Sequence, residues 1–501
     1  MKRNEKMKET TKGKKKFKLN SFNKNKKYAL GAAIAVAGLV IIFGVTHGVK
    51  IMAAKNEYSH TVQVAEKEAE KLYGDREQLS MKEKYKDVEI NYIYPEQNDK
   101  EVENMIVSQM KERAYATVDD MEKKKESGSD KKMIVQYSGS NVTDRIISFT
   151  VDQRIYTNQD YNFRLFRELK EPQNIIDGRT GNTFEMKDLF REGADPIPTI
   201  NQRAKEEIMK TEQCTLDNVT EINSFTYPAE LAGSGIQITE KGLKVPVTAE
   251  SFGIESVDIP LGRLLSVIKP EFLDQDSKNK LNDNNIENLE EAGVKRVALT
   301  FDDGPNPQTT GRLLDYMKEN GVKGTFFVLG EKAGQNADVL KRMAEEGHEL
   351  GNHSWGHANL LKSTEAEINE EVLKTSYSIY KASGHFPETM RPPYGAVDAR
   401  VAEQIDMPIS MWSVDSEDWM NKGNPDKTFE NTIAYTKPGD VLLFHDVYES
   451  SVDATIMTIQ KLKEEGYEFV TMSELFGYQL KPEKVYHNIK NVRDLKEEEG
   501  K

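Results

Sequence analysis

Cysteine is almost absent from this sequence, with Cys214 the only one among 501 residues. One cysteine cannot close a disulfide within the chain, so the fold must depend on packing and hydrogen bonding. The residues around Cys214 contain no pattern that would activate a thiol, and we expect it to be a small core residue. Charged residues make up 30% and apolar residues 37% of the chain. These proportions are typical of globular domains with charged linkers and exclude a protein with many membrane spans.

Long apolar runs are equally scarce, and only residues 28–46 (YALGAAIAVAGLVIIFGVT) are uncharged over a membrane-spanning length. At about 1.5 Å per residue in a helix, this run nearly crosses the roughly 30 Å hydrocarbon core of a bilayer. A cleaved signal peptide is the alternative, although its apolar core is usually shorter, at about 7–15 residues. We therefore predict an uncleaved transmembrane anchor at residues 28–48.

The chain as a whole lacks positive charge and carries −14, but its start does not. Residues 1–27 contain twelve Lys or Arg residues and two Glu residues, a local charge of +10, which leaves −24 for the remainder. A basic head on an acidic body argues against nucleic acid as a partner. Under the positive-inside rule, it predicts that residues 1–27 are cytoplasmic and that everything beyond the anchor is extracellular.

The region that follows the anchor has mixed helix and strand patterns. Residues 49–86 are polar with apolar residues at helical spacing, which predicts a stalk helix that leads away from the membrane. Residues 87–270 contain alternating segments, such as 88–94, and helical segments, such as 101–112. They predict an α+β accessory region of one or two domains, and no residue pattern in it indicates an activity.

Two further segments have the composition of linkers and tails. Residues 271–294 are rich in Asn and Asp, which predicts a linker, and residues 481–501 are charged, which predicts a tail outside the core. Between them, residues 295–480 alternate short apolar runs with helical stretches. This alternation predicts βα units around a parallel sheet. A full eight-stranded barrel takes about 250 residues, so we expect a smaller or incomplete barrel.

Polar segments follow the apolar runs of residues 295–480 at the point where each predicted strand ends. Parallel barrels place their active sites at this end of the sheet, because the loops that follow the strands meet there. One such segment alone is an ordinary turn, whereas five in one region predict a catalytic site. The five segments are 300–305 (TFDDGP), 353–357 (HSWGH), 391–395 (RPPYG), 415–419 (DSEDW) and 442–446 (LLFHD).

His353 and His357 are four residues apart, so on one helical turn both imidazoles would point the same way and could share a metal ion. Many such pairs are exposed histidines without a ligand, but Asp303 adds a carboxylate. Two histidines and one carboxylate, with further positions open for water and substrate, are typical of a catalytic site for Zn²⁺ or another divalent metal. The helical His-Glu-x-x-His segment of zinc metalloproteases is absent.

Asp302 and Asp303 are adjacent carboxylates, which need compensating positive charge in a protein interior. A metal ion can compensate Asp303, and Arg391 is the natural candidate for Asp302. His445 follows a buried-looking strand. Asp418 could orient this imidazole and keep it protonated, so that it donates a proton to a leaving group.

The five segments resemble, in order, the five motifs of the polysaccharide deacetylases, carbohydrate esterase family 4. The resemblance covers roughly residues 295–478, a little over a third of the chain, and no segment departs from its motif. It implies an α/β fold with a distorted (β/α)7-type barrel, and a metal-dependent hydrolase that removes acetyl groups from a glycan. The implied metal is Zn²⁺, with Co²⁺ or another transition metal as the alternative.

The resemblance also implies a role for each polar residue. Asp302 resembles the general base, which Arg391 holds, and His445 resembles the general acid, which Asp418 tunes. A water deprotonated by Asp302 would attack the acetamide carbonyl, and His445 would protonate the departing amine. The implied metal ligands are Asp303, His353 and His357, the implied oxyanion donor is the backbone N–H of Tyr394, and the implied acetyl pocket consists of Trp419 and Leu443.

The predicted layout resembles that of membrane-bound peptidoglycan N-acetylglucosamine deacetylases of Gram-positive bacteria. This resemblance implies peptidoglycan as the partner, acetate as the product and a wall that resists lysozyme. Other substrates stay open: N-acetylmuramic acid, chitin-type oligomers, an exopolysaccharide and acetylated xylan. An alternative of another class is a non-catalytic envelope sensor, in which residues 87–270 bind a ligand and the barrel only binds glycan.

Overall fold

The computed structural model describes residues 47–499 apart from 74–76, 98, 127–130, 142–145, 160–161, 171–173 and 178–181. The predicted cytoplasmic segment lies outside the described residues. So does the predicted anchor, except for its last two residues, which begin helix α1 (His47–Tyr73). Within the described part of the chain, no helix has both the length and the apolar character needed to cross a membrane.

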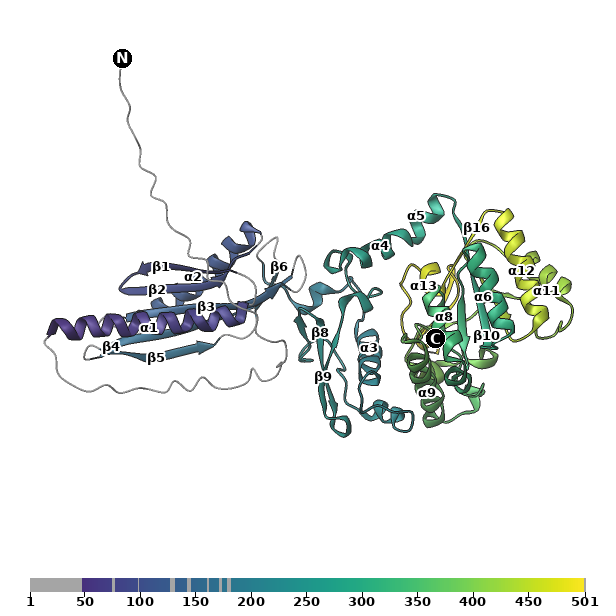
Figure 1. The fold of residues 1–501 in the computed structure, drawn as a ribbon, viewed down its shortest axis with the longest axis horizontal. Helices are drawn as coiled ribbons and strands as arrows, with labels where there is room; N and C mark the ends of the chain where they lie inside the picture. The colour runs from purple at the N-terminus through teal and green to yellow at the C-terminus, as the bar shows by residue number, and fades with distance from the viewer. Residues whose placement is uncertain are drawn as a thin grey trace, which may run out of the picture.

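The first described part is an α+β domain built on a six-stranded sheet (Figure 1). The strand order is β1-β2-β3-β4-β5 with β6 paired to β4; β2 and β3 are parallel and the other pairs are antiparallel. Successive residues of a strand face opposite sides of a sheet. Ile93 and Ile134 therefore pack against α1, whereas Tyr92 and Val135 pack against α2 on the other face. The elements after α1 are β1 (Gln78–Tyr85), β2 (Val88–Pro95), α2 (Lys100–Lys123), β3 (Lys131–Asn141), β4 (Ile146–Gln159), β5 (Asn162–Lys170) and β6 (Asn174–Asp177).

The predicted stalk helix within residues 49–86 is present as α1, and it packs along this sheet. Its Tyr73 hydroxyl donates a hydrogen bond to the carbonyl oxygen of Ile93 at 3.0 Å, and residues 78–85 form the edge strand β1. A helix with an apolar stripe buries that stripe against the nearest apolar surface. The buried residues of α1 are Tyr58, Val62, Ala65, Ala69 and Tyr73.

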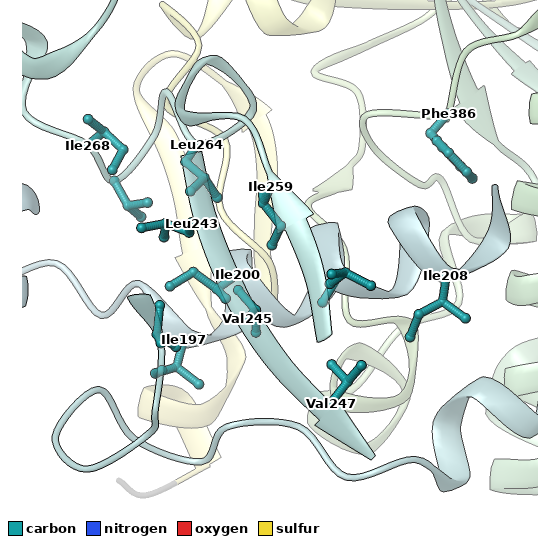
Figure 2. Close-up of a cluster of buried hydrophobic side chains, with 14 of the residues drawn as sticks. Ile197, Ile200, Ile208, Leu243, Val245, Val247, Ile259, Leu264, Ile268 and Phe386 are labelled. Carbon is teal, nitrogen blue, oxygen red and sulfur yellow. The ribbon is translucent and has the colours of Figure 1, made fainter. Parts of the chain in front are cut away.

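A second α+β domain, called the middle domain here, follows over residues 184–283. Its three-stranded antiparallel sheet packs on helix α3, and Figure 2 shows Ile200 of α3 and Val245 of β8 within the shared core. The same core includes Leu373 and Phe386, which belong to the last part of the chain, so the middle domain packs against that part. Cys214 is buried in this core, as expected, and burial raises the pKa of its thiol to about 11. The elements are α3 (Ile197–Met209), β7 (Gln237–Thr239), β8 (Gly242–Ala249) and β9 (Ile254–Ile259), with short 3-10 turns between them.

The predicted linker at residues 271–294 is not irregular, because most of it forms two short helices. The side chain of Asp274 accepts a hydrogen bond from the backbone N–H of Ser277, and Asn285 caps the next helix in the same way. Asn and Asp are favoured N-cap residues, which explains the composition that suggested a linker. The two helices are α4 (Gln275–Asp283) and α5 (Ile286–Glu291).

The last part of the chain, the catalytic region, is built on a parallel sheet of order β12-β11-β10-β15-β14, with β16 beside the first half of β10. The centre of β10, from Val297 to Phe301, is completely or almost completely buried, as expected for a strand that is covered on both faces. The predicted parallel α/β arrangement is thereby confirmed, and the closed barrel stays a prediction. The strands are β10 (Lys295–Gly304), β11 (Thr325–Val328), β12 (Glu349–Asn352), β13 (Ile409–Ser410), β14 (Val414–Asp415), β15 (Val441–His445) and β16 (Tyr467–Val470).

Helices alternate with these strands along the chain and pack around the sheet, as Figure 1 shows. Helix α9 contacts both the middle domain and the loop after β12. The helices are α6 (Thr309–Asn320), α7 (Gly330–Ala333), α8 (Ala337–Glu345), α9 (Glu365–Ser383), α10 (Ala399–Ile405), α11 (Pro425–Tyr435), α12 (Glu449–Glu464) and α13 (Met472–Leu475).

The predicted tail at residues 481–501 is largely part of the fold. Strand β17 (Lys484–Asn488) pairs in parallel with β13, and β18 (Asn491–Asp494) pairs with β17 before the short helix α14 (Leu495–Glu499). Val485 is fully buried and Tyr486 nearly so. Because these two residues are adjacent in the strand, they face opposite sides and pack into two different apolar clusters.

Candidate active site

The three predicted metal ligands lie together at the carboxyl ends of two neighbouring strands. Asp303 is near the end of β10, and His353 and His357 belong to the loop after β12. Asp303 Oδ1 lies 3.4 Å from His353 Nε2 and 3.3 Å from His357 Nε2. The sequence suggested a helical turn for the two histidines, but the structure does not have one there. An irregular loop brings them together, with ring centroids 5.2 Å apart.

The geometry of these three residues fits a metal ion. Two ligands that are each about 2.1 Å from a tetrahedral Zn²⁺ lie roughly 3.4 Å from each other, which matches the separations seen here. Asp303 Oδ1 is buried and has no hydrogen-bond partner. Burial alone would raise the pKa of Asp303, but the neighbouring histidines, His353 first among them, lower it to about 2. The carboxylate is therefore ionised and ready to bind a cation.

Backbone and side-chain groups fix the orientation of both imidazoles. His353 Nδ1 lies 2.7 Å from the carbonyl oxygen of Arg391. A carbonyl can only accept a hydrogen bond, so Nδ1 carries a proton, and Nε2 is the nitrogen left to bind a metal ion beside Asp303. His357 Nδ1 lies 3.1 Å from the hydroxyl of Tyr394. Both Nε2 atoms thus face the space beside Asp303.

Asp302 and Arg391 form the base side of the site. Arg391 Nη1 donates to Asp302 Oδ1 at 2.8 Å, and the guanidinium makes three more hydrogen bonds, to the Thr300 hydroxyl and the carbonyls of Ser410 and Met411. Arg391 is completely buried and Asp302 is 3% exposed. The structure brings the predicted pair together, and the fixed fork of the guanidinium holds the carboxylate in one place.

His445 and Asp418 form the acid side of the site. His445 Nδ1 and the His445 backbone N–H each lie 2.7 Å from a different oxygen of Asp418. Burial alone would lower the pKa of His445, but the hydrogen bond and charge of Asp418 outweigh it and raise the pKa to about 9. His445 is therefore a cation at neutral pH and can donate a proton from its other nitrogen.

The three residues predicted to contact substrate occupy different environments. Tyr394 is 68% exposed and Trp419 is 47% exposed, whereas Leu443 is buried in β15. Exposed aromatic rings beside polar loops are suited to contact a glycan. The assignment of Trp419 and Leu443 to an acetyl pocket stays a prediction, as does the oxyanion role of the Tyr394 N–H.

Left-handed backbone conformations recur in the loops of the site. Each of these costs a residue other than glycine roughly 1–3 kcal/mol and persists only where the surroundings enforce it. None of these residues is Gly or Asn, the residues that most often adopt this conformation, so sequence reasoning did not predict them. They are Asp303 (φ 70°), Ser354 (φ 67°), His357 (φ 62°), Tyr394 (φ 62°) and Glu417 (φ 57°).

Sequence reasoning missed Asn352 and Glu371. Asn352 Oδ1 accepts from the Ser354 N–H at 2.8 Å, and Glu371 Oε2 accepts from the N–H groups of Trp355 and Gly356. Asn352 directly precedes a recognised motif, so its position was a usable signal. Glu371 lies on helix α9, outside every motif, and only the structure connects it to the site.

Three groups meet at the carboxyl ends of the parallel strands: a triad that can bind a metal ion, the carboxylate of Asp302 and the protonated imidazole of His445. This arrangement is typical of a metal-dependent hydrolase. Residues 290–409 match the family model described as Polysaccharide deacetylase. The chain is 30% identical over 468 residues to peptidoglycan-N-acetylglucosamine deacetylase PgdA of Listeria monocytogenes, which covers 92% of this chain and 98% of the relative. The chain belongs to the polysaccharide deacetylase family, as its motifs predicted, and is a hydrolase of N-acetyl groups.

Two further relatives resemble shorter parts of the chain. Peptidoglycan-N-acetylmuramic acid deacetylase PdaC of Bacillus subtilis is 32% identical over 307 residues, 58% of this chain and 65% of the relative. A peptidoglycan-N-acetylglucosamine deacetylase of Bacillus cereus is 40% identical over 188 residues, 36% of this chain and 68% of the relative. The three relatives carry names that refer to two different sugars of one polymer.

Proposed function

We propose that this protein hydrolyses the N-acetyl groups of N-acetylglucosamine residues in peptidoglycan, releases acetate and makes the wall more resistant to lysozyme. The proposal depends on one observation: the Asp303–His353–His357 triad lies at the same strand ends as the Asp302–Arg391 pair and the Asp418–His445 pair. The similarity to PgdA over 92% of the chain supports the choice of polymer and sugar.

In this proposal, Asp303, His353 and His357 hold a divalent metal, with Zn²⁺ as the first candidate and Co²⁺ or another transition metal as alternatives. When bound, such an ion polarises a carbonyl as a Lewis acid and lowers the pKa of a water. Imidazole nitrogens and a carboxylate oxygen are ligands that Zn²⁺ and its neighbours in the transition series accept.

The side chains of this chain then move the protons. Asp302, fixed by Arg391, takes a proton from the attacking water. The backbone N–H of Tyr394 donates to the oxyanion that develops on the acetamide carbonyl. His445, kept protonated by Asp418, gives its proton to the departing amine. Trp419 and Leu443 receive the acetyl methyl group.

We place the protein in the cell membrane, with one helix at residues 28–48, a cytoplasmic N-terminus and the catalytic region outside, facing the wall. The support for this location is the uncharged run at residues 28–46 and the Lys-rich segment before it. Peptidoglycan then lies within reach of the active site. We further propose that the catalytic strands close into a distorted seven-stranded barrel, supported by the parallel bridges of Met390 to Asn352 and to Ile409.

N-acetylmuramic acid is the second candidate substrate, because PdaC, which is named for that sugar, is 32% identical over 58% of this chain. The test is to incubate the full-length chain with muramidase-released wall fragments and to assign each lost acetyl group to its sugar by mass spectrometry. Loss from N-acetylglucosamine alone supports the proposal. Loss from N-acetylmuramic acid alone would replace it with the second candidate, and no loss from any glycan would favour a binding protein.

A further inference from the structure

Helix α9 lies between the loop that carries both histidine ligands and the middle domain. Glu371 on one side of α9 contacts that loop, here called the metal loop (residues 353–357). On the other side, Asn369 Oδ1 accepts from the Asn223 side chain at 2.6 Å, and the Tyr377 hydroxyl donates to the Cys214 carbonyl at 2.9 Å. Helical residues two positions apart point about 200° away from each other, which explains how one helix serves both neighbours.

Glu371 binds the middle of the metal loop. One carboxylate oxygen, Oε2, accepts hydrogen bonds from the backbone N–H of Trp355 at 2.7 Å and of Gly356 at 3.0 Å. An ionised acceptor makes such bonds roughly twice as strong as a neutral one. These two residues lie between His353 and His357, so the carboxylate fixes the part of the chain that sets the spacing of the two ligands.

The metal loop needs such support because of its backbone. Ser354 and His357 both have positive φ, at 67° and 62°, in a loop whose single glycine, Gly356, is not in that conformation. Left-handed backbone is unfavourable for residues with a side chain, so without restraint the loop would relax and His357 would move. The carboxylate of Glu371 is the one side-chain group that accepts from consecutive N–H groups of this loop among the described residues.

Asn352 connects the same helix to the same loop by a second route. Its Nδ2 donates to the Val372 carbonyl at 2.8 Å and to the Ser376 hydroxyl at 3.0 Å, while its Oδ1 accepts from the Ser354 N–H. Two residues thus connect the loop to α9: Glu371, which lies on the helix, and Asn352, which is hydrogen-bonded to it. Of the two, Glu371 contacts the loop closer to His357.

We propose that Glu371 is a positioning residue of the metal site, which holds His353 and His357 at the separation that a metal ion requires. It acts through the backbone of the metal loop and does not contact substrate. The inference rests on the proposed metal-dependent deacetylation. Partners that orient metal ligands typically change metal affinity by about 10–100-fold when they are removed.

The test compares three variants of the metal-free full-length chain. Glu371→Met keeps the length of the side chain and removes the acceptor, whereas Glu371→Gln keeps a weaker, neutral acceptor. Glu370→Met is the matched control, because Glu370 is an exposed neighbour on the same helix, paired with Lys374. Zinc affinity is measured by calorimetric titration, and the visible absorption of the cobalt-loaded proteins reports the ligand geometry.

We expect Glu371→Met to bind zinc about 10–100-fold more weakly and to alter the cobalt spectrum, with a lower kcat and an unchanged KM. Glu371→Gln should lie between it and the parent, and Glu370→Met should match the parent. Parental zinc affinity and cobalt spectrum in Glu371→Met would overturn the inference. If Glu371→Met does not fold by circular dichroism, parental affinity in Glu371→Gln would overturn it instead. A parent that binds no zinc and releases no acetate would reject the proposed function as well, which distinguishes the two failures.

Discussion

The base side and the acid side of the active site hold their carboxylates with different cations. Asp302 meets the guanidinium of Arg391, which is completely buried and makes three further hydrogen bonds. Asp418 meets the imidazole of His445, whose charge depends on pH. A guanidinium keeps its charge at any pH at which the protein is folded. The base side is therefore built for a constant charge, and the acid side for a proton that leaves and returns.

The largest effect should follow the loss of the base itself. Asp302→Asn preserves the shape of the side chain and removes its ability to take a proton. We expect kcat to fall by about 10²–10⁴-fold, while zinc binding by the metal-free chain changes little. Asp315→Asn is the control, because Asp315 is an exposed aspartate that also pairs with an arginine, Arg342. Equal kcat in Asp302→Asn and the parent would remove Asp302 from the chemistry.

Removing the permanent cation should destabilise the fold. Arg391→Met leaves Asp302 as a buried carboxylate without its partner, which costs about 3–5 kcal/mol of unfolding free energy. Arg312→Met is the matched change at the surface, where Arg312 pairs with Glu449 and Asp453, and should cost no more than about 1 kcal/mol. Urea unfolding of both variants measures the difference. Similar losses in the two variants would mean that burial adds nothing to the base side.

The acid side should respond to pH where the base side does not. Because the folded-state pKa of His445 is raised to about 9, the charged form persists below that pH and is lost as pH rises through it. The rate should fall above about pH 9, and Asp418→Asn should move this alkaline limb toward the ordinary histidine pKa of about 6.5. By linkage, the pair stabilises the fold fully below about pH 6.5 and loses this contribution as pH rises through 9.

Profiles of kcat against pH for the parent and Asp418→Asn measure this shift. An alkaline limb that does not move in Asp418→Asn would show that Asp418 does not tune the acid.

The smallest effect is expected outside both sides, where helix α9 meets the middle domain. Tyr377→Phe removes only the hydrogen bond to the Cys214 carbonyl, so unfolding free energy should fall by about 1–3 kcal/mol, and kcat by less than twofold. Thermal unfolding and acetate release measure the two quantities. A loss of kcat as large as that of Asp302→Asn would mean that the middle domain controls the chemistry directly.

The sequence predicted ten candidate site residues beside the strand ends, and the structure brings together the metal-type triad, the Asp302–Arg391 pair and the Asp418–His445 pair. The roles of Tyr394, Trp419 and Leu443 stay predictions. It was not sufficient for the backbone that holds them. The spacing of His353 and His357 suggested a helical turn, whereas Ser354 and His357 have left-handed backbone conformations. Neither of these two residues is Gly, so the sequence did not indicate this conformation. Glu371 was missed because its two hydrogen bonds are made to backbone groups of a distant loop.

The packing of the polar segments was the other feature that the sequence did not predict. The linker and the tail were predicted from their polar composition and the stalk from apolar residues at helical spacing, but none of these patterns shows the surface on which the segment packs. Val62, Ala65 and Ala69 recur at helical intervals and attach α1 to a sheet. Val485 and Tyr486 are buried residues of the charged tail, and their strand β17 pairs with β13. Whether such a segment packs on a sheet or pairs as a strand depends on residues far away in the chain, which a local sequence pattern does not include.

The most direct test of the account is acetate release from peptidoglycan by the full-length chain, before and after removal of metal. We predict that chelation abolishes release, that Zn²⁺ restores it, and that His353→Ala releases no acetate with or without Zn²⁺. Release that continues unchanged in the chelated protein, or in His353→Ala, would contradict the claim that Asp303, His353 and His357 hold the ion on which the base side and the acid side depend.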